Sequence, residues 1–508
     1  MTGRFFSDFR LLVRNAARII ALLLIIIPLL ADPGVSAEEP SSRKKLDLLS
    51  CITLTLRKNF TMMESMETLL QREADFYIAK NTLQTKVGGS LKSGSNTSLQ
   101  GYRDSEVRSE LVYKLPEGDS INAVAAVGAT NFTHHAGHDL SFQYRYPLAK
   151  GNGITVGSKE IIKAQRNLTI QEMNYFVSKQ DVVNSVIKAY FRLLQARKTI
   201  EVSVKYVESA KENLRITRRK YQEGMVPKID MTRAEIQYVS AQSDLVNVQK
   251  SWADARDELL TQMGVDPREE LDIDYNVPYT PRDFLEDECV DMALLLRKEL
   301  LATGEELFQK RDDVTIAKDA LKPQVDLVTS YSTSRREFLW TGVEIPTYPQ
   351  WSAMLECSID ISKRSLREEL LKTKRLVILQ EQRVEDKKRS IVKEVRNGLR
   401  LIRSAATRVV LKEENLKAAE ERVRLARRSW EEGLINNREL TDAQQGLVTA
   451  QVELIAAKID YILAEYDLRK AMGFDLAHLT AEEKREKDLE GPGQKKSSID
   501  RFLGVGEK

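Results

Sequence analysis

The stretch Tyr221-Gln222-Glu223-Gly224 returns later in the chain as Trp430-Glu431-Glu432-Gly433, 209 positions further on. A second pair of landmarks, Met263-Gly264 and Met472-Gly473, has the same separation, so nothing need be inserted or deleted between them. Self-similarity at a fixed spacing is the signature of a repeated structural unit. The sequence therefore predicts two copies of one unit, over residues 45–270 and 271–476.

Each copy carries apolar residues every seven positions, which is the pattern of a coiled-coil seam. In the second copy a line of large residues runs beside a line of alanines: Leu440, Leu447, Leu454, Tyr461 and Leu468 beside Ala443, Ala450, Ala457, Ala464 and Ala471. The first copy repeats most of both lines, starting at Met231 and Ala234. Gly224 and Gly433 stand where the outgoing helices end, because glycine accepts the left-handed backbone of a C-cap. Each copy is predicted to be an antiparallel helical hairpin.

The outgoing helix is expected to be far longer than the returning one. Residues Glu160–Glu223 contain neither Gly nor Pro and would reach about 95 Å as a helix, whereas Ile229–Met263 would reach about half of that. A separate helix over Glu286–Leu321 is expected to stack end-on and complete this layer. The segment Leu46–Leu83 is expected to do the same for the other copy.

Strand-like segments flank the helices. Residues 140–146 alternate apolar and polar side chains, which is the period of a β-strand, and 324–334, 351–361 and 121–131 are also strand-like. Residues 83–93 compete with 121–131 as the first strand. About four strands per chain are too few to close a barrel, so several chains are expected to share one.

The N-terminus has the features of an export signal. Four arginines up to Arg18 precede an apolar run of 12 residues, Ile19–Leu30, and Val35-Ser36-Ala37 offers a small-residue cleavage site. The run is shorter than the roughly 20 residues that a membrane-spanning helix needs, so a signal peptide over 1–37 is favoured over an N-terminal anchor. The charged segment 477–508 shows no core pattern and is predicted to be disordered.

The tip pattern carries a family resemblance. An aromatic residue, two residues, glycine, five residues and an acid occur twice, from Tyr221 to Asp230 and from Trp430 to Glu439. This pattern resembles the TolC-type outer-membrane factors, and the resemblance covers about residues 45–476. It implies a mainly α fold with a minor β part. Three chains would form an α-helical coiled-coil barrel from their pseudo-repeated hairpins, joined to a shared 12-stranded transmembrane β-barrel.

The resemblance also implies a function. The chain would be the homotrimeric exit duct of a tripartite efflux pump or type I secretion system, set in outer-membrane lipid with a long periplasmic extension. Cargo would come from an inner-membrane pump of the RND, ABC or MFS type, through a periplasmic adaptor docked at the hairpin tips. The residues that mark these tips are Tyr221, Gly224, Trp430 and Gly433. Neither the cargo nor the pump class follows from the sequence.

The resemblance places acids at the closed end of the duct. Glu439 and Asp442, three apart on one helix face, match the acids that line the constriction, and Asp230 matches an acid that helps to hold the entrance shut. Some members complete this lock with a basic residue where Ile435 stands here, and Arg438 is a candidate substitute. The alternative is that these acids only complement the helix dipole.

Other functional classes find little support. No nucleophile elbow, P-loop or zinc-protease motif is present, so we expect neither an enzyme nor a cofactor. The 78 Lys and Arg residues nearly balance the 75 Asp and Glu residues and are interspersed with them, which argues against nucleic acid as a partner. The competing hypothesis is a periplasmic coiled-coil scaffold or adaptor without a lumen.

Three small groups of residues have chemistry that suggests a special role. His134, His135 and His138 lack the further ligands of a zinc site, so a polar loop is favoured there. Trp340 and Trp351 fit either an aromatic girdle at the lipid interface or ordinary packing. An odd number of widely spaced cysteines argues against a disulfide framework: Cys51, Cys289 and Cys357.

Overall fold

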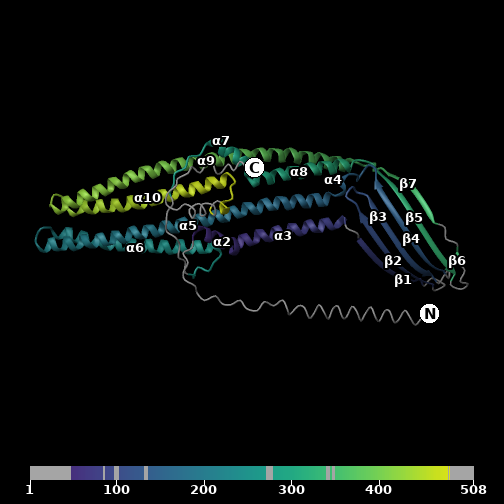
Figure 1. Ribbon diagram of the computed structural model, residues 1–508, viewed down its shortest axis with the longest axis horizontal. Coiled ribbons are helices and arrows are strands. Elements are labelled where there is room, and N and C mark those ends of the chain that lie inside the picture. Colours follow the sequence, from purple (N-terminus) through teal and green to yellow (C-terminus); the bar gives the residue numbers. More distant parts are fainter. Residues whose placement is uncertain are drawn as a thin grey trace, which may run out of the picture. The chain divides into compact units, whose positions relative to one another are not determined.

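The computed structural model describes residues 47–83, 86–96, 102–130, 135–269, 279–338, 344–345, 349–478 and 480. The predicted signal peptide, Trp340, His134 and most of the charged tail lie outside these residues. The described part is mainly helical and carries one β-sheet at one end of its long helices (Figure 1). None of the helices in it is both long and apolar enough to cross a membrane.

Two long helices organise the structure: α5, Lys159–Gln222, and α9, Arg364–Glu431. Each packs along its own return helix, which is α6 (Lys228–Met263) for α5 and α10 (Asn437–Ala471) for α9. The 64 residues of α5 correspond to a length of about 96 Å. The two predicted hairpins are confirmed, and they pack on each other through α5 and α10.

Short helices cover the rest of each long helix. They come in two pairs, each interrupted at a single residue: α2 (Leu48–Lys58) and α3 (Phe60–Lys80), then α7 (Glu286–Leu296) and α8 (Lys298–Asp319). The segment Glu286–Leu321, which was predicted as one helix, is therefore two helices. Two further short elements are the 3₁₀ turn η2 (Asn81–Leu83) and α4 (Ile154–Gly157).

The order of stacking also differs from the prediction. The Asn59 side chain donates to the Gln262 carbonyl oxygen at 2.7 Å, so α3 begins where α6 ends. The Arg297 guanidinium donates to the Ala471 carbonyl oxygen at 3.2 Å, so α8 begins where α10 ends. Thus α3 continues α6, and α8 continues α10, each within its own repeat (Figure 1). In both cases the residue just before the short helix bonds to the end of the return helix.

The junction between α6 and α3 leaves no room for a side chain. Gly264 has a φ of +70°, and a Cβ there would lie 2.5 Å from the Lys58 carbonyl oxygen. We expect Gly264→Ala to lower the free energy of unfolding by about 3 kcal/mol or more, since the clash adds to left-handed strain. Gly224→Ala is the matched control. Gly224 also has a left-handed φ, of +75°, but an added Cβ would meet no atom within 4 Å, so this variant has the backbone strain without the clash. Thermal unfolding followed by circular dichroism checks this, and equal losses in the two variants would contradict it.

The sheet is antiparallel and has more strands than expected. Its strands are β1 (Lys86–Asn96), β2 (Tyr102–Lys114), β3 (Ser120–Thr130), β4 (His135–Pro147), β5 (Gln324–Phe338), β6 (Glu344–Ile345) and β7 (Gln350–Ser358). They lie in the order β1-β2-β3-β4-β5, and both β6 and β7 pair with the edge of β5 that faces away from β4.

The four predicted strand segments are confirmed as β3, β4, β5 and β7. The expected number of strands was wrong, because the described residues alone form six long strands and one of two residues. Residues 83–93 and 121–131 are not alternatives, since the first overlaps β1 and the second overlaps β3. An additional hairpin, β1–β2, extends the sheet beyond β3 along its full length.

The sheet has one apolar face and one polar face, and the apolar face is exposed. The register places one row of mostly apolar partners across all six long strands: Val87, Leu111, Ala123, Phe142, Tyr331 and Trp351. Val87 and Trp351 are 77% and 80% exposed, and the Trp351 ring lies 4.6 Å from that of Tyr331. The neighbouring row is polar at most positions: Gly88, Glu110, Val124, Ser141, Ser332 and Gln350.

The largest apolar core joins the two repeats. Most of its buried residues come from α2, α5, α6 and α10, among them Cys51, Val183, Leu194, Leu259 and Ile459. Burial raises the pKa of the Cys51 thiol to about 12, so this cysteine is an unreactive packing residue. All three cysteines are free thiols, and Cys357 on β7 is the exposed one.

Asp475 ties the segment after α10 to α5. Its carboxylate accepts hydrogen bonds from the Lys179 ammonium at 2.8 Å and the Gln180 amide at 2.9 Å. Burial acts to raise the pKa of Asp475, but these two bonds hold it below its usual value. A carboxyl with a lowered folded pKa adds stability above its unfolded pKa of about 4, and this stability is lost as the pH falls through the folded pKa.

We therefore expect Asp475→Asn to flatten the acid side of the stability profile. Denaturant unfolding at several pH values from about 7 down to about 3 measures this effect. Asp460→Asn is the control, because Asp460 is exposed and lies 3.8 Å from Arg408. An unchanged pH dependence in Asp475→Asn would refute the assigned role of this carboxylate.

Candidate functional site: the hairpin tips

The two hairpin tips are built in the same way. Gly224 and Gly433 have φ values of +75° and +76°, and both follow the last turn of a long helix. At the first tip, the Met225 N–H donates to the Lys220 carbonyl oxygen at 2.8 Å. At the second tip, the Leu434 N–H donates to the Ser429 carbonyl oxygen, also at 2.8 Å. These bonds form the glycine-dependent helix ending that the repeat predicted.

The three acids expected at the aperture have different surroundings. Asp230, in the first turn of α6, is only 8% exposed, and its carboxylate lies 3.5 Å from the Arg233 guanidinium. Glu439, in the first turn of α10, is exposed and makes no ion pair with any residue that the structure describes. Asp442 is exposed as well, and its carboxylate lies 3.7 Å from Arg438. Of these three acids, Glu439 is therefore the one whose charge is least compensated by other residues of the same chain.

An apolar residue, Ile435, stands at the position where a basic residue would complete the lock. Ile435 is half-buried and lines a groove on α9 that also reaches Glu439. Arg438, the candidate substitute, is already paired with Asp442 inside the chain. The groove is completed by Ala418, Glu421, Arg422, Leu425, Ala426 and Ser429.

Tyr221 and Trp430 occupy matching positions but not matching surroundings. Trp430 is 4% exposed, whereas Tyr221 is 37% exposed. The Lys220 ammonium lies 3.9 Å from the centre of the Trp430 ring and donates to the Trp430 carbonyl oxygen at 3.1 Å. This contact joins the last turn of α5 to the last turn of α9, and so links the two tips.

The Lys220–Trp430 contact was missed by the sequence analysis. A signal was available, because the position that matches Lys220 in the second repeat is Ser429. The repeat therefore places a lysine next to the tip aromatic in only one copy. A cation above an indole ring is stabilising by about 0.5–2 kcal/mol, depending on how dry the contact is.

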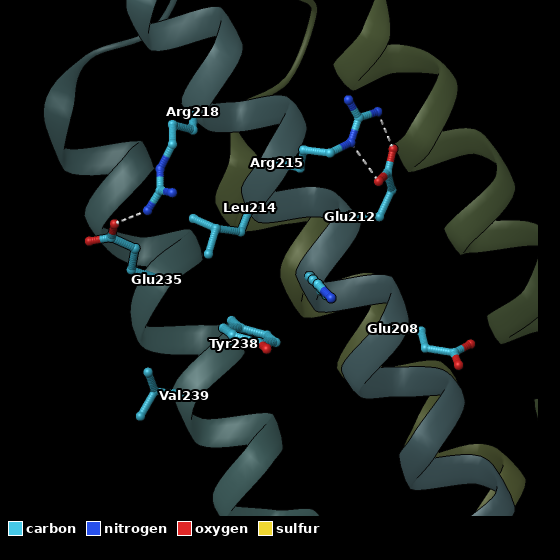
Figure 2. A pocket seen from close by; sticks show the side chains of 9 residues that line it. Glu208, Glu212, Leu214, Arg215, Arg218, Glu235, Tyr238 and Val239 are labelled. Carbon is cyan, nitrogen blue, oxygen red and sulfur yellow. Dashed lines mark hydrogen bonds and ion pairs between the residues drawn. The ribbon is translucent and has the colours of Figure 1, made fainter.

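A surface groove of about 740 Å³ lies between α5 and α6 behind the first tip (Figure 2). Its walls carry several charges, and two of its arginines are already paired. Arg218 bonds to Glu235 at 2.8 Å across the two helices, and Arg215 bonds to Glu212 along α5 (Figure 2). Since both arginines are paired, Lys211 is the one lining cation without an ion pair among the described residues. The other lining residues are Glu208, Lys211, Leu214, Tyr238 and Val239.

A metal centre has no support among the residues that the structure describes. Within them, no three His, Cys, Asp or Glu side chains lie close enough to hold an ion. His138 lies in β4 and is exposed. The tips thus offer carboxylates, exposed apolar residues and a buried aromatic ring that holds a lysine.

The arrangement of repeats, strands and tips matches a known family. The profile described as "Outer membrane efflux protein" matches residues 145–265 and 289–474, which is more than half of the chain. The chain belongs to the outer membrane efflux protein family. It is 21% identical over 435 residues to the probable efflux pump outer membrane protein TtgC of Pseudomonas putida, covering 78% of this chain and 85% of that relative.

Solved structures share the fold at low sequence identity. CusC is similar with a TM-score of 0.63 at 14% identity, over 87% of this chain and 96% of that one. VceC of Vibrio cholerae is similar with a TM-score of 0.62 at 14% identity, over 84% and 96% of the two chains. The predicted TolC-like fold, mainly α with a minor β part, is confirmed.

Membership in this family defines the general function. The protein is an outer-membrane exit duct of an efflux system, and its helical part is the periplasmic extension. It works together with other components of an efflux pump. The family consists of channel proteins rather than enzymes, and membership favours the duct over the scaffold hypothesis.

Proposed function

We propose that three copies of this chain enclose one duct, which receives cargo from an inner-membrane pump through a periplasmic adaptor docked at the hairpin tips. The observation that carries this proposal is the sheet, whose apolar face is exposed across six long strands. A single chain has nothing among its described residues to cover that face or to pair both edges. Lipid and further copies satisfy these two requirements.

The helices support assembly independently. On α6, two further pairs of apolar residues are 58–64% exposed, and the members of each pair are seven positions apart: Ile229 with Ile236, and Val239 with Val246. On α9, Leu371 and Ile378 are also seven apart and exposed. Because this period is that of a coiled-coil seam, these faces suit packing against neighbouring copies.

The tips suit two tasks. In a three-copy ring, Glu439 and Asp442 would surround the opening and attract cations, with Asp230 more deeply placed beside Arg233. Met225 and Leu434 follow the tip glycines and are 70% and 72% exposed. Together with Tyr221, Gly224, Trp430 and Gly433, they form the surface that we assign to the adaptor.

Extraction from outer membranes tests the assembly. The proposal expects a trimer in mild detergent that resists dissociation on heating, because its copies share one sheet. Recovery of the mature chain as a soluble monomer would instead support a scaffold without a lumen. The pump class, whether RND, ABC or MFS, would then follow from the pump that co-purifies with the trimer.

Docking at the tips is tested with the two exposed apolar residues. Met225→Asp combined with Leu434→Asp is expected to weaken adaptor binding by about tenfold or more, since a charge replaces buried apolar area at each contact. Leu295→Asp, which places a charge at a 74% exposed apolar position on α7, far from the tips, is the control for adaptor binding. Unchanged affinity in the tip variant, measured on intact trimers, would remove the tips as the docking surface.

A further inference from the structure

We propose that all six long strands of each chain enter the barrel wall, and that β1 of one copy pairs with β7 of the next. Three copies then close eighteen strands, instead of the twelve implied by the family resemblance. This inference rests on the proposed three-copy assembly and specifies its membrane part. It concerns the β1–β2 hairpin, of which the sequence predicted only residues 83–93, as an alternative first strand.

The β1–β2 hairpin has the dimensions of a wall segment. β1 has 11 residues and β2 has 13, while the shortest long strand, β7, has 9. A tilted strand needs roughly 9–11 residues to cross the hydrocarbon layer, so each of the six is long enough. The register of β2 with β3 runs without interruption from Asp104–Thr130 to Lys114–Ser120. The hairpin is therefore joined to the sheet over its whole length.

The hairpin also continues both faces of the sheet. Val87, Leu91 and Val107 are 77%, 76% and 52% exposed, and they lie on the same face as the apolar side chains of β3 and β4. On the opposite face, Glu110 accepts a hydrogen bond from the Asn122 amide of β3 at 3.0 Å. If the hairpin lay outside the barrel wall, its apolar and polar faces would no longer continue those of β3 and β4. Each charge that it exposed to lipid would cost about 2–4 kcal/mol near the midplane.

The two free edges of the sheet suit each other. Among the described strands, none pairs with the outer edge of β1 or with the outer edge of β7. β1 leads away from the helices and β7 returns toward them, so their pairing would be antiparallel like every other pair in the sheet. An unpaired edge cannot persist in lipid, because its backbone groups have no partner there. A second copy of this chain supplies the complementary edge.

The consequence is a wide outer-membrane pore. Barrel diameter grows roughly linearly with strand number, so eighteen strands give about 1.5 times the diameter of twelve. Barrels of about 16–18 strands leave an open aqueous channel. The membrane end of this duct would therefore not restrict cargo, and selection would lie at the hairpin tips.

Disulfide trapping tests the β1–β7 seam with the native Cys357 on β7. Cys357 is exposed on the apolar face, while Cys51 and Cys289 are buried. Val87→Cys places a second thiol on β1, and Ala123→Cys places one at the same level on β3. Gly89→Cys and Leu91→Cys, with Ala125→Cys and Val127→Cys as their partners on β3, extend the scan along both strands.

Any disulfide from these variants must join two chains. Within one chain, β3 and β7 are three strand spacings apart, about 14 Å, and β1 is further away, which exceeds the reach of a disulfide. Val325→Cys is the control for oxidation, because Val325 and Cys357 are register partners in one chain, so their disulfide removes both free thiols without linking two chains. Outer membranes are oxidised with copper–phenanthroline, and linked chains are separated on denaturing gels.

We expect linked chains from at least one β1 variant and none from the β3 variants. Linked chains from β3 variants but not from β1 variants would overturn the inference, because the seam would then lie at β3 and the barrel would have twelve strands. Absence of all links from a heat-resistant trimer would also overturn it. If the unoxidised protein forms no trimer, the proposed assembly itself has failed, and the inference fails with it.

Discussion

Replacing both Glu439 and Asp442 with alanine is expected to abolish most of the cation preference of the reconstituted channel. In a three-copy ring these residues place six carboxylates around one narrow opening. Charges of one sign in a confined opening raise the local counter-ion concentration by about tenfold or more. Removing them should bring the ratio of cation to anion permeability close to one.

The single variants should not be equal. Glu439 has no ion pair with the described residues of its chain, whereas Asp442 lies 3.7 Å from Arg438. Glu439→Ala should therefore account for the larger share of the loss, and Arg438→Ala should increase the cation preference by releasing Asp442. Glu420→Ala, which removes an exposed acid of α9, is the control.

Reversal potentials in planar bilayers under a salt gradient measure this preference. A double variant that keeps the selectivity of the unmodified channel would show that these acids do not line the constriction. They would then be acids that only complement the N-terminal dipole of α10, the alternative that the sequence left open.

Replacing Trp430 with alanine is expected to loosen the tips by about 3–5 kcal/mol, which is the usual cost of removing a buried large aromatic side chain. Trp430 is 4% exposed and holds the Lys220 ammonium 3.9 Å above its ring. Because Lys220 belongs to the other hairpin, the loss should separate the two tips and raise the conductance of the channel. Lys220→Met should have a smaller effect of about 1 kcal/mol, since packing is largely kept.

Tyr221→Ala provides the matched control for Trp430→Ala. Tyr221 occupies the same position in the first repeat but is 37% exposed, so its loss should be less than half as costly. Hydrogen exchange of the amides around both tips reports the local free energy of opening. Similar increases in exchange for the two variants would refute the assigned link between the hairpins.

Local sequence rules were sufficient for the hairpins. The seven-residue spacing and the glycines at 224 and 433 predicted the bounds of α5 and α6 to within one or two residues. The breaks at Asn59 and Arg297 were not predictable in this way, because neither residue is Gly or Pro. Each break depends on a bond to a return helix more than 170 positions away in the chain.

The sequence predicted residues 83–93, which overlap β1, only as an alternative to 121–131, and it did not predict β2. The reasons differ for the two strands. β1 contains Gly88, Gly89 and Gly94, and glycine lowers strand propensity and gives no side chain to alternate. β2 does alternate, with Val107, Leu111 and Tyr113 on one face and Glu110 on the other, but its many charges masked this pattern. The alternation in β2 becomes a strand signal only when one face is assigned to lipid and the other to water.

The candidate site was predictable in position but not in environment. The repeat and the family resemblance placed Asp230 and Glu439 at the starts of matching helices, and the structure confirms these positions. Asp230 is buried and Glu439 is exposed because the two hairpins have different neighbours. The repeat pattern in the sequence does not predict these neighbours. The same asymmetry buries Trp430 and leaves Tyr221 accessible.

Single-particle imaging of the protein extracted from outer membranes tests the central claim most directly. The central claim is that copies of this chain surround one continuous passage. We predict a three-fold particle with a hollow that runs from the sheet to the hairpin tips, walled by twelve helical strands and, at the membrane end, by eighteen β-strands. Separate single chains, or an assembly without a hollow between its copies, would contradict it.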